Sequence, residues 1–292
     1  MRRITAVVNP AAGGLRRRRD VDLVREVLKR LQAEGDVVTL EYTRDLDHAG
    51  TLAATAARRD DMVIAVGGDG TVGAVAAGVS AADGVLGVIP SGRGNDFARQ
   101  LELPRDAGAL GTILSKGKSR AVDLVDTPRG TVAGNVCTGV DALAAVYVDG
   151  FRFLGGAGYH AAALRAVAAW RPVSYTVTVD GARRRFRGYT VLVANSGFYG
   201  NGRHAAPQAR VDDGLLDVML LHEVPLPVFL SVAMRELYDG THVRRPEVEV
   251  LRGREVEVRA DRALPCCGDG EVLGVLPLSM RVRAGALRVV TA

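Results

Sequence analysis

The sequence has few cysteines, few aromatic residues and no long apolar run. Its 292 residues include three cysteines, one tryptophan and 5% aromatic residues. With only Cys137 and the adjacent pair Cys266 and Cys267, neither a disulfide framework nor a zinc site is favoured, so we expect free thiols in a reducing cytosol. No apolar run reaches about 18 residues, so no transmembrane helix is expected. The first apolar stretch is interrupted at Asn9-Pro10, too early for a signal peptide.

Aromatic residues are also scarce near the basic clusters, which argues against nucleic-acid binding. The net charge is +5, and arginines gather at Arg16–Arg19 and at Arg183–Arg187. A solvated loop and a polar strand edge would explain both clusters without any function. The functional interpretation is attraction to polyphosphate or to an anionic membrane surface.

The first 120 residues alternate between short apolar strands and amphipathic helices. Hydrophobic residues make up 48% of the chain and charged residues 24%, as in a globular protein. Strands are predicted at 4–8, 37–42, 62–66 and 85–89, with helices at 21–31, 49–57, 72–79 and 96–101. This alternation is typical of an α/β domain whose parallel sheet is covered on both faces.

After residue 124 the pattern changes to alternating apolar and polar residues. "YTVTVDGARRRFRGYTVLVAN" contains a hairpin signal at Asp180-Gly181, and "LLDVMLL" and "EVEVLRGREVEVRA" continue the alternation. We predict a second, mainly antiparallel β domain with one helix near 157–170. The domain boundaries are placed at 1–122 and 123–279, and a C-terminal strand at 280–292 could return to the first domain.

Turn-forming or glycine-rich segments follow three predicted strands of the first domain. They read "VVNPAAGG", "GGDGT" and "PSGRGNDFAR". Carboxyl ends of parallel strands share one edge of the sheet, and bare backbone N–H groups there suit phosphate. No lysine follows the glycines and the spacing is not G-x-G-x-x-G, so the site is neither a P-loop nor a dinucleotide fingerprint. Asp69 would be repelled by phosphate, which leaves it to act through Mg²⁺ or to orient a donor.

Five motifs, in this order, resemble those of the bacterial diacylglycerol-kinase-like lipid kinases. They are "NPAAGG", "GGDGT", "GNDFAR", "DDGLLDV" and "DGE", and they extend over nearly the whole chain. "GGDGT" alone is a weak signal, because NAD kinases share it. The late "DGE" and the "GNDFAR" segment fit NAD kinases poorly.

The resemblance implies an N-terminal α/β nucleotide-binding domain, a C-terminal mainly antiparallel β-sandwich and an active site between them. It further implies phosphoryl transfer from ATP, with Mg²⁺, to a lipid hydroxyl such as that of diacylglycerol. We therefore expect a cytoplasmic enzyme of phospholipid metabolism, peripherally associated with an anionic membrane surface. A homodimer is compatible with the sequence.

Site residues carried over from the resemblance fall into three groups. By this resemblance Asp269 is the expected general base, with Glu271 as the second candidate. Asp69 and Asp96 are expected to belong to the network that holds Mg²⁺. The turn at Asp213 resembles a structural metal site of these kinases, in which backbone oxygens near Arg210 and Leu215 would be further ligands. The nucleotide-lining positions are Asn9, Pro10, Gly13, Thr43, Gly67, Gly68, Gly70, Thr71 and Asn95.

Two departures from the usual motifs lie beside the expected nucleotide. The usual loop G-T-G-N-D reads "GRGND" here, so Arg93 replaces a threonine that would meet the phosphates, and we expect its guanidinium to contact them. After "GGDGT" the usual Val-Asn-Glu is replaced by Val72-Gly73-Ala74. Two alternatives stay open: a kinase of another hydroxylated small molecule, and a nucleotide-binding module that has lost catalysis.

Overall fold

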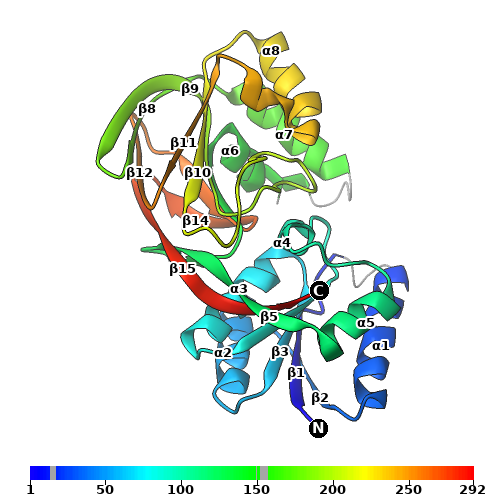
Figure 1. The fold of residues 1–292 in the computed structure, drawn as a ribbon. Coiled ribbons are helices and arrows are strands. Elements are labelled where there is room, and N and C mark those ends of the chain that lie inside the picture. Colours follow the sequence, from blue (N-terminus) through cyan, green and yellow to red (C-terminus); the bar gives the residue numbers. More distant parts are fainter. Residues whose placement is uncertain (14–17, 149, 152–156) are drawn as a thin grey trace.

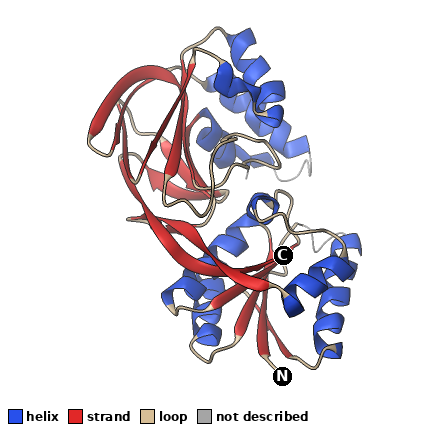
Figure 2. Cartoon of the chain, in the orientation of Figure 1, coloured by secondary structure: helices blue, strands red, loops and turns tan. Residues whose placement is uncertain are grey.

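The computed structural model describes residues 1–13, 18–148, 150–151 and 157–292. Its N-terminal and C-terminal halves form two lobes, a helix-covered sheet and a strand-rich lobe with helices on one side (Figure 1). Figure 2 shows that strands continue from one lobe into the other. Arg16 and Arg17 of the first basic cluster lie outside the described residues.

The N-terminal lobe contains a four-stranded parallel core ordered β2-β1-β3-β4. Val8 pairs with Tyr42 and with Val66, and Gly67 pairs with Pro90, so the strands end at one edge of the sheet. The elements are β1 (Arg3–Val8), α1 (Arg18–Ala33), β2 (Val37–Tyr42), α2 (Leu46–Ala57), β3 (Met62–Gly67), α3 (Asp69–Ala81), β4 (Val85–Pro90), α4 (Asp96–Gln100) and α5 (Ala107–Lys116).

Local sequence explains where these elements lie and begin. Every residue of β3 is buried, as expected of a central strand covered on both faces, whereas β2 is an exposed edge strand. Asp45 caps α2 by accepting a hydrogen bond from the His48 backbone N–H at 2.7 Å, and Asp106 caps α5 through Ala109 in the same way. The predicted strands and helices of this half are confirmed to within a few residues, and α5 was not predicted.

The C-terminal lobe is built mainly from antiparallel strands. Asp180 and Gly181, with φ of 46° and 83°, form the predicted tight turn between β8 and β9. Strands β5 (Lys118–Thr127) and β15 (Leu278–Thr291) pair with each other and run through both lobes. The other elements are β6 (Gly130–Val132), β7 (Asn135–Gly139), α6 (Val140–Val148), α7 (Ala157–Ala169), β8 (Val173–Val179), β9 (Ala182–Ala194), β10 (Leu216–His222), α8 (Leu226–Ser231), η2 (Val232–Glu236), α9 (Leu237–Asp239), η3 (Thr241–Arg244), β11 (Val248–Gly253), β12 (Glu255–Ala260), β13 (Pro265–Gly268) and β14 (Glu271–Val275).

The expectation of a single helix in this lobe is wrong. Besides α7, the chain forms α6 and the helical run from α8 through η3. The sequence of α6, "VDALAAVYV", is apolar almost throughout and therefore lacks the periodicity that reveals a surface helix. The segments from α8 to η3 are short, and their helical type changes along the run.

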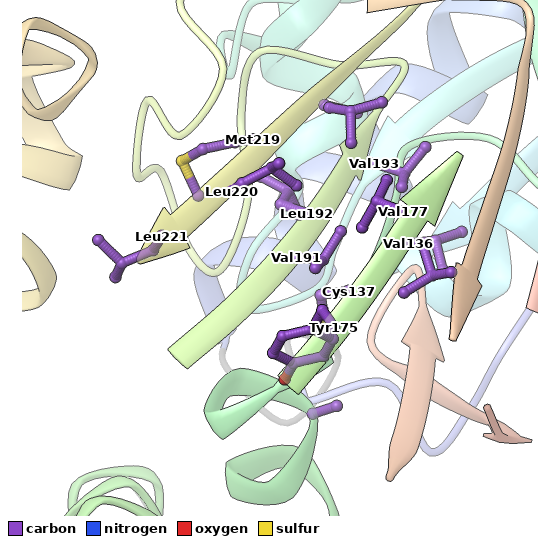
Figure 3. Close-up of a cluster of buried hydrophobic side chains, with 14 of the residues drawn as sticks. Val136, Cys137, Tyr175, Val177, Val191, Leu192, Val193, Met219, Leu220 and Leu221 are labelled. Atoms are coloured by element: carbon purple, nitrogen blue, oxygen red, sulfur yellow. The ribbon is translucent and has the colours of Figure 1, made fainter. Parts of the chain in front are cut away.

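Each lobe has its own hydrophobic core. Valines and leucines of β7, β8, β9 and β10 interdigitate in the C-terminal core, where Tyr175 is also buried (Figure 3). The N-terminal core surrounds β1, β3 and β4. Strand β15 joins the two, because Leu278–Arg281 pair with β12 whereas Arg288 and Val289 pair in parallel with β4.

Among the described residues, no helix is both long and apolar enough to cross a bilayer.

Candidate active site

The loop after β1 is tied to the start of α3. Asn9 Nδ2 donates a hydrogen bond to Thr71 Oγ1 at 2.9 Å, and Asn9 Oδ1 accepts one from the Ala11 backbone at 2.9 Å. Pro10 is exposed beside Asn9, and Thr43 is buried at the end of β2, where its backbone N–H donates to Val8. Residues predicted from three different loops therefore lie at one edge of the sheet.

Contacts within the protein account for part of the glycine pattern in "GGDGT". A Cβ added at Gly67 would lie 2.6 Å from the Thr71 side chain, and one added at Gly68 would lie 3.2 Å from the Gly92 Cα. Real Cβ atoms do not approach other heavy atoms as closely as the first distance. Gly67 thus lets α3 begin directly after β3, and Gly68 lets the loop after β3 lie close to Gly92 in the loop after β4, in addition to any ligand.

The loop after β4 is held in shape by Asn95. This residue has φ of 53° and its side chain bonds Gly92 twice, accepting from the backbone N–H at 2.8 Å and donating to the carbonyl at 3.1 Å. Asparagine tolerates this left-handed conformation better than most side chains. Arg93 is exposed and lies against the first loop, since a Cβ at Gly13 would be 3.1 Å from its Nε.

Asp69 is the first residue of α3, and its carboxylate faces the backbone N–H groups at the N-terminus of α4. Its Oδ1 accepts a hydrogen bond from Phe97 at 3.1 Å. Burial raises the pKa of Asp69, the negative charge of Asp96 raises it further, and the backbone N–H groups oppose both effects. The Asp69 carboxylate is therefore a desolvated group close to a second carboxylate.

Asp96 joins the two lobes. Its carboxylate accepts hydrogen bonds from the backbone of Asn201 at 2.9 Å and of Gly202 at 2.7 Å, and it pairs with Arg99. Gln100, one turn further along α4, accepts from the Gly197 backbone at 2.9 Å. The Asp96 side chain thus has a structural task that its motif did not reveal.

Asp269 and Glu271 reach α3 from the C-terminal lobe. Asp269 has φ of 50° in the turn between β13 and β14, and its two oxygens accept hydrogen bonds from Ala133 and Gly134, each at 2.8 Å. A Cβ at Gly70 of α3 would lie 2.9 Å from Glu271 Oε1. The "DGE" turn therefore packs on the first turns of the helix that begins at Asp69.

The pKa of Asp269 is raised to about 7. Desolvation by the surrounding protein is the largest cause, and the charge of Asp69 adds to it. The backbone N–H groups of Ala133 and Gly134 act in the opposite direction because they stabilise the carboxylate. Asp269 keeps some accessible surface, so desolvation comes from the protein packed around the carboxylate rather than from complete enclosure. A carboxyl with this pKa exchanges its proton near neutral pH.

Donors for a magnesium ion converge beside Gly94. A Cβ at Gly94 would lie 2.6 Å from Asp69 Oδ2 and 3.2 Å from Asp96 Oδ2. Magnesium is usually held by one or two carboxylates together with substrate phosphates, and Asp69 fits this role. Asp96 already pairs with Arg99 and accepts two backbone N–H bonds, so its part in holding the ion stays a prediction. In the described part of the chain, no three His, Cys, Asp or Glu side chains form a group that could hold a metal by themselves.

The turn at Asp213 offers a different environment. Asp213 Oδ1 accepts a hydrogen bond from the Leu215 backbone at 3.1 Å, and Oδ2 pairs with Arg252 at 2.5 Å. Arg210 pairs with Asp212 instead. The Asp213 carboxylate is therefore paired with Arg252 here, and the metal site predicted at this turn, with backbone oxygens near Arg210 and Leu215, stays a prediction.

Several residues that shape the site escaped sequence reasoning. Ala133 and Gly134 act through backbone N–H groups, which leave no signature in the side-chain pattern. Buried Asp123 accepts hydrogen bonds from Gly214 and Gly285, each at 2.7 Å, and so fixes the "DDGLLDV" turn against β15. A single carboxylate within the apolar run "AVDLV" indicates a buried, hydrogen-bonded acid, and this pattern could have identified Asp123 from the sequence.

A separate open groove of about 450 Å³ lies on the strands β5, β12 and β15, lined by residues that include Asp126, Glu257 and Arg281. It contains none of the predicted site residues, and the converging carboxylates and loops remain the candidate site.

Two family models match the chain along most of its length. The "Diacylglycerol kinase catalytic domain" matches residues 3–127, and the "YegS C-terminal NAD kinase beta sandwich-like domain" matches residues 134–291. The chain belongs to the diacylglycerol-kinase-like lipid kinases. The family indicated by the five motifs is thereby confirmed, as is the predicted pair of folds. The domain boundaries predicted at 122 and 279 stay a prediction.

Relatives of this lipid kinase family member come from several bacteria. A "Diacylglycerol kinase" from Mycobacterium tuberculosis is 29% identical over 299 residues, covering 98% of this chain and 94% of the relative. A "Diacylglycerol kinase" from Bacillus subtilis is 29% identical, with 95% and 92% coverage. A "Probable lipid kinase YegS-like" from Pseudomonas aeruginosa is 31% identical, with 78% and 75% coverage.

The fold is also found among solved structures. The crystal structure of a diacylglycerol kinase from Bacillus anthracis superposes with a TM-score of 0.80 at 20% identity, covering 99% of this chain and 97% of that chain. At this identity the likeness shows the fold of this family member and nothing about its substrate.

Proposed function

We propose that the protein is an ATP-dependent kinase that transfers the γ-phosphoryl group to a lipid hydroxyl such as that of diacylglycerol. The observation that supports this best is the meeting of two sets of groups on α3. The glycine loops and Asp69 lie at its N-terminus, and the Asp269 carboxylate reaches the same helix from the other lobe.

The loops after β1, β3 and β4 would hold the nucleotide. Asn9, Pro10 and Gly13 would line one side, with Thr43 at the neighbouring strand end. Arg93 would place its guanidinium near the phosphates, since it lies beside Gly13. The remaining proposed contacts are Gly67, Gly68, Gly70, Thr71 and Asn95.

Asp69 and Asp96 would hold Mg²⁺ together with the phosphates, and the ion, when bound, would neutralise phosphate charge. Deprotonated Asp269 would accept the proton of the acceptor hydroxyl. The hydroxyl oxygen would then bond to the γ-phosphorus while the bond to the ADP oxygen breaks, and the acceptor would leave as a phosphate monoester. Glu271 would orient the acceptor or Asp269 from its place above Gly70.

The decisive experiment is a radiolabelled ATP assay against a panel of lipid and non-lipid alcohols. We expect label in a lipid product, with diacylglycerol among the acceptors, and its loss when Asp269 is replaced by Asn. Label only in a non-lipid product would establish the alternative acceptor class. ATP binding without transfer to any alcohol would support a module that has lost catalysis.

A further inference from the structure

Two glycines flank the Asp269 carboxylate. A Cβ at Gly73 of α3 would overlap Asp269 Oδ2, and a Cβ at Gly134 would lie 2.7 Å from Oδ1. Gly73 belongs to the N-terminal lobe, whereas Gly134 follows β6 in the C-terminal lobe. The carboxylate thus lies between two bare backbone segments, one from each lobe.

The two positions of α3 that meet the "DGE" turn are both glycines. Gly70 and Gly73 are three residues apart and therefore lie on the same side of the helix. Glu271 covers Gly70 and Asp269 covers Gly73. Glycine within a helix is less stable than alanine, so two glycines on one face need a reason, and the contact with the turn supplies it.

From this contact we infer that Gly73 is a positioning residue, which lets the Asp269 carboxylate rest directly on the helix that begins at the phosphate loop. The inference builds on the proposed function, because the carboxylate positioned in this way is the proposed base. Any side chain at residue 73 would push Asp269 outward and away from the backbone N–H groups of Ala133 and Gly134. The departure from Val-Asn-Glu is then a means of bringing the two lobes together rather than a sign of lost catalysis.

The test compares Gly73→Ala with wild type by steady-state kinetics. We expect kcat to fall tenfold or more while the KM for ATP stays within twofold, because the base moves and the nucleotide loops do not. The matched control is Gly111→Ala in α5, where the three atoms nearest the added Cβ all belong to the Arg30 side chain, the closest at 3.1 Å. That variant should keep kcat within twofold. An unchanged kcat in Gly73→Ala, or a raised KM for ATP with normal kcat, would overturn the inference.

A double-mutant cycle with Asp269→Gly tests the contact independently of catalysis. Glycine adopts φ of 50° readily, so this variant removes the carboxylate without straining the turn. Gly73→Ala should lower the denaturant midpoint in the wild-type background, and leave it unchanged or raise it once Asp269 is absent, because alanine favours the helix. If Gly73→Ala alone does not fold, the double variant should fold, and its failure would show that residue 73 clashes with something else.

The cycle also separates the two proposals. Coupling in the stability measurements together with an absence of kinase activity in wild type would reject the proposed function while leaving the contact intact. Full kinase activity in wild type, without coupling between residues 73 and 269 in stability, would reject the role of Gly73 and leave the proposed function intact.

Discussion

Asp269 shows how backbone geometry can set the chemistry of one side chain. Its left-handed backbone turns the carboxylate toward Ala133 and Gly134, whose N–H groups hold both oxygens. Packing against α3 removes water from the same oxygens and raises the pKa. The side chain is therefore fixed in place and still able to exchange a proton near neutral pH, which is what a general base requires.

The pH dependence of the reaction should report the Asp269 carboxyl. The proposed base must be deprotonated to accept a proton, and the Asp269 pKa of about 7 means that this form accumulates as pH rises through 7. We expect kcat to increase about tenfold per pH unit below this value and to level off above it. The raised pKa of Asp69 acts in the same direction, since Mg²⁺ prefers the charged form.

Asp269→Asn should lower kcat by roughly 10²-fold or more and leave ATP binding intact. It should also remove the decrease of kcat at low pH that titration of Asp269 causes. Calorimetry with ATP and Mg²⁺ is the control for binding. If Asp269→Asn turns over normally and Glu271→Gln does not, then Glu271 is the base.

Arg93→Thr restores the residue usual in related kinases. The guanidinium lies beside Gly13, where it can offer several fixed N–H donors to phosphate. We expect the variant to change the KM for ATP or kcat by more than a few-fold in initial-rate assays. Kinetics indistinguishable from wild type would mean that the guanidinium takes no part in nucleotide binding.

At the scale of elements, the short helix α4 connects the lobes. Asp96 and Gln100 bind backbone N–H groups of the segment 196–202, and Arg99 lies over the Phe198 ring at 5.6 Å. A five-residue helix has little stability of its own. The segment 196–202 therefore holds α4 in place, and α4 in turn fixes that segment.

Replacing Gln100 by Met should leave the Gly197 N–H without its acceptor. Losing a partner for a partly buried donor costs about 1–3 kcal/mol, so we expect urea unfolding to show a loss of free energy of unfolding in this range. Glu102→Gln, at an exposed position just after α4, is the control and should change the free energy by less than about 0.5 kcal/mol. Equal stability of the two variants would contradict the assigned contact.

The sequence predicted those elements whose pattern reflects burial. The strands of the first lobe are apolar because both faces are covered, and the loops at their ends carry turn residues. Helix α6 escaped because it is apolar on all sides, and α8 because it is only six residues long. The contacts of Asp269 could not be read either, since its partners are backbone atoms brought together by the fold.

In the molecule as a whole, exposed apolar side chains occur on the helical side of the C-terminal lobe. Figure 1 shows α6, α7 and α8 there, opposite the β8–β9 hairpin. Leu164 of α7, Met234 of η2 and Tyr238 of α9 are 68%, 73% and 52% exposed. Arg165 lies over the Tyr147 ring at 4.5 Å, so cationic and apolar groups occur together. The predicted basic cluster Arg183–Arg187 lies on the β8–β9 hairpin and therefore away from this side, and two of its arginines pair with Glu249 and Glu223. We propose that the apolar side, rather than this cluster, contacts an anionic membrane surface, from which a lipid acceptor would enter.

Vesicle flotation can test this contact. Binding to anionic vesicles should exceed binding to neutral ones and weaken as salt rises, because screening reduces the attraction. Met234→Asp should lower binding, whereas Leu40→Asp on the β2 edge of the other lobe, where Leu40 is 44% exposed, should not. Equal binding to neutral and anionic vesicles would remove the electrostatic part of the proposal.

Strand β15 has a consequence for how the protein is made. The sheet of the N-terminal lobe receives this strand beside β4 through Arg288 and Val289, although nearly two hundred residues separate the two strands in sequence. During translation the N-terminal half therefore emerges with an open sheet edge that is closed only after the whole C-terminal lobe has left the ribosome. We expect that edge to be the part of the nascent chain most in need of chaperone protection.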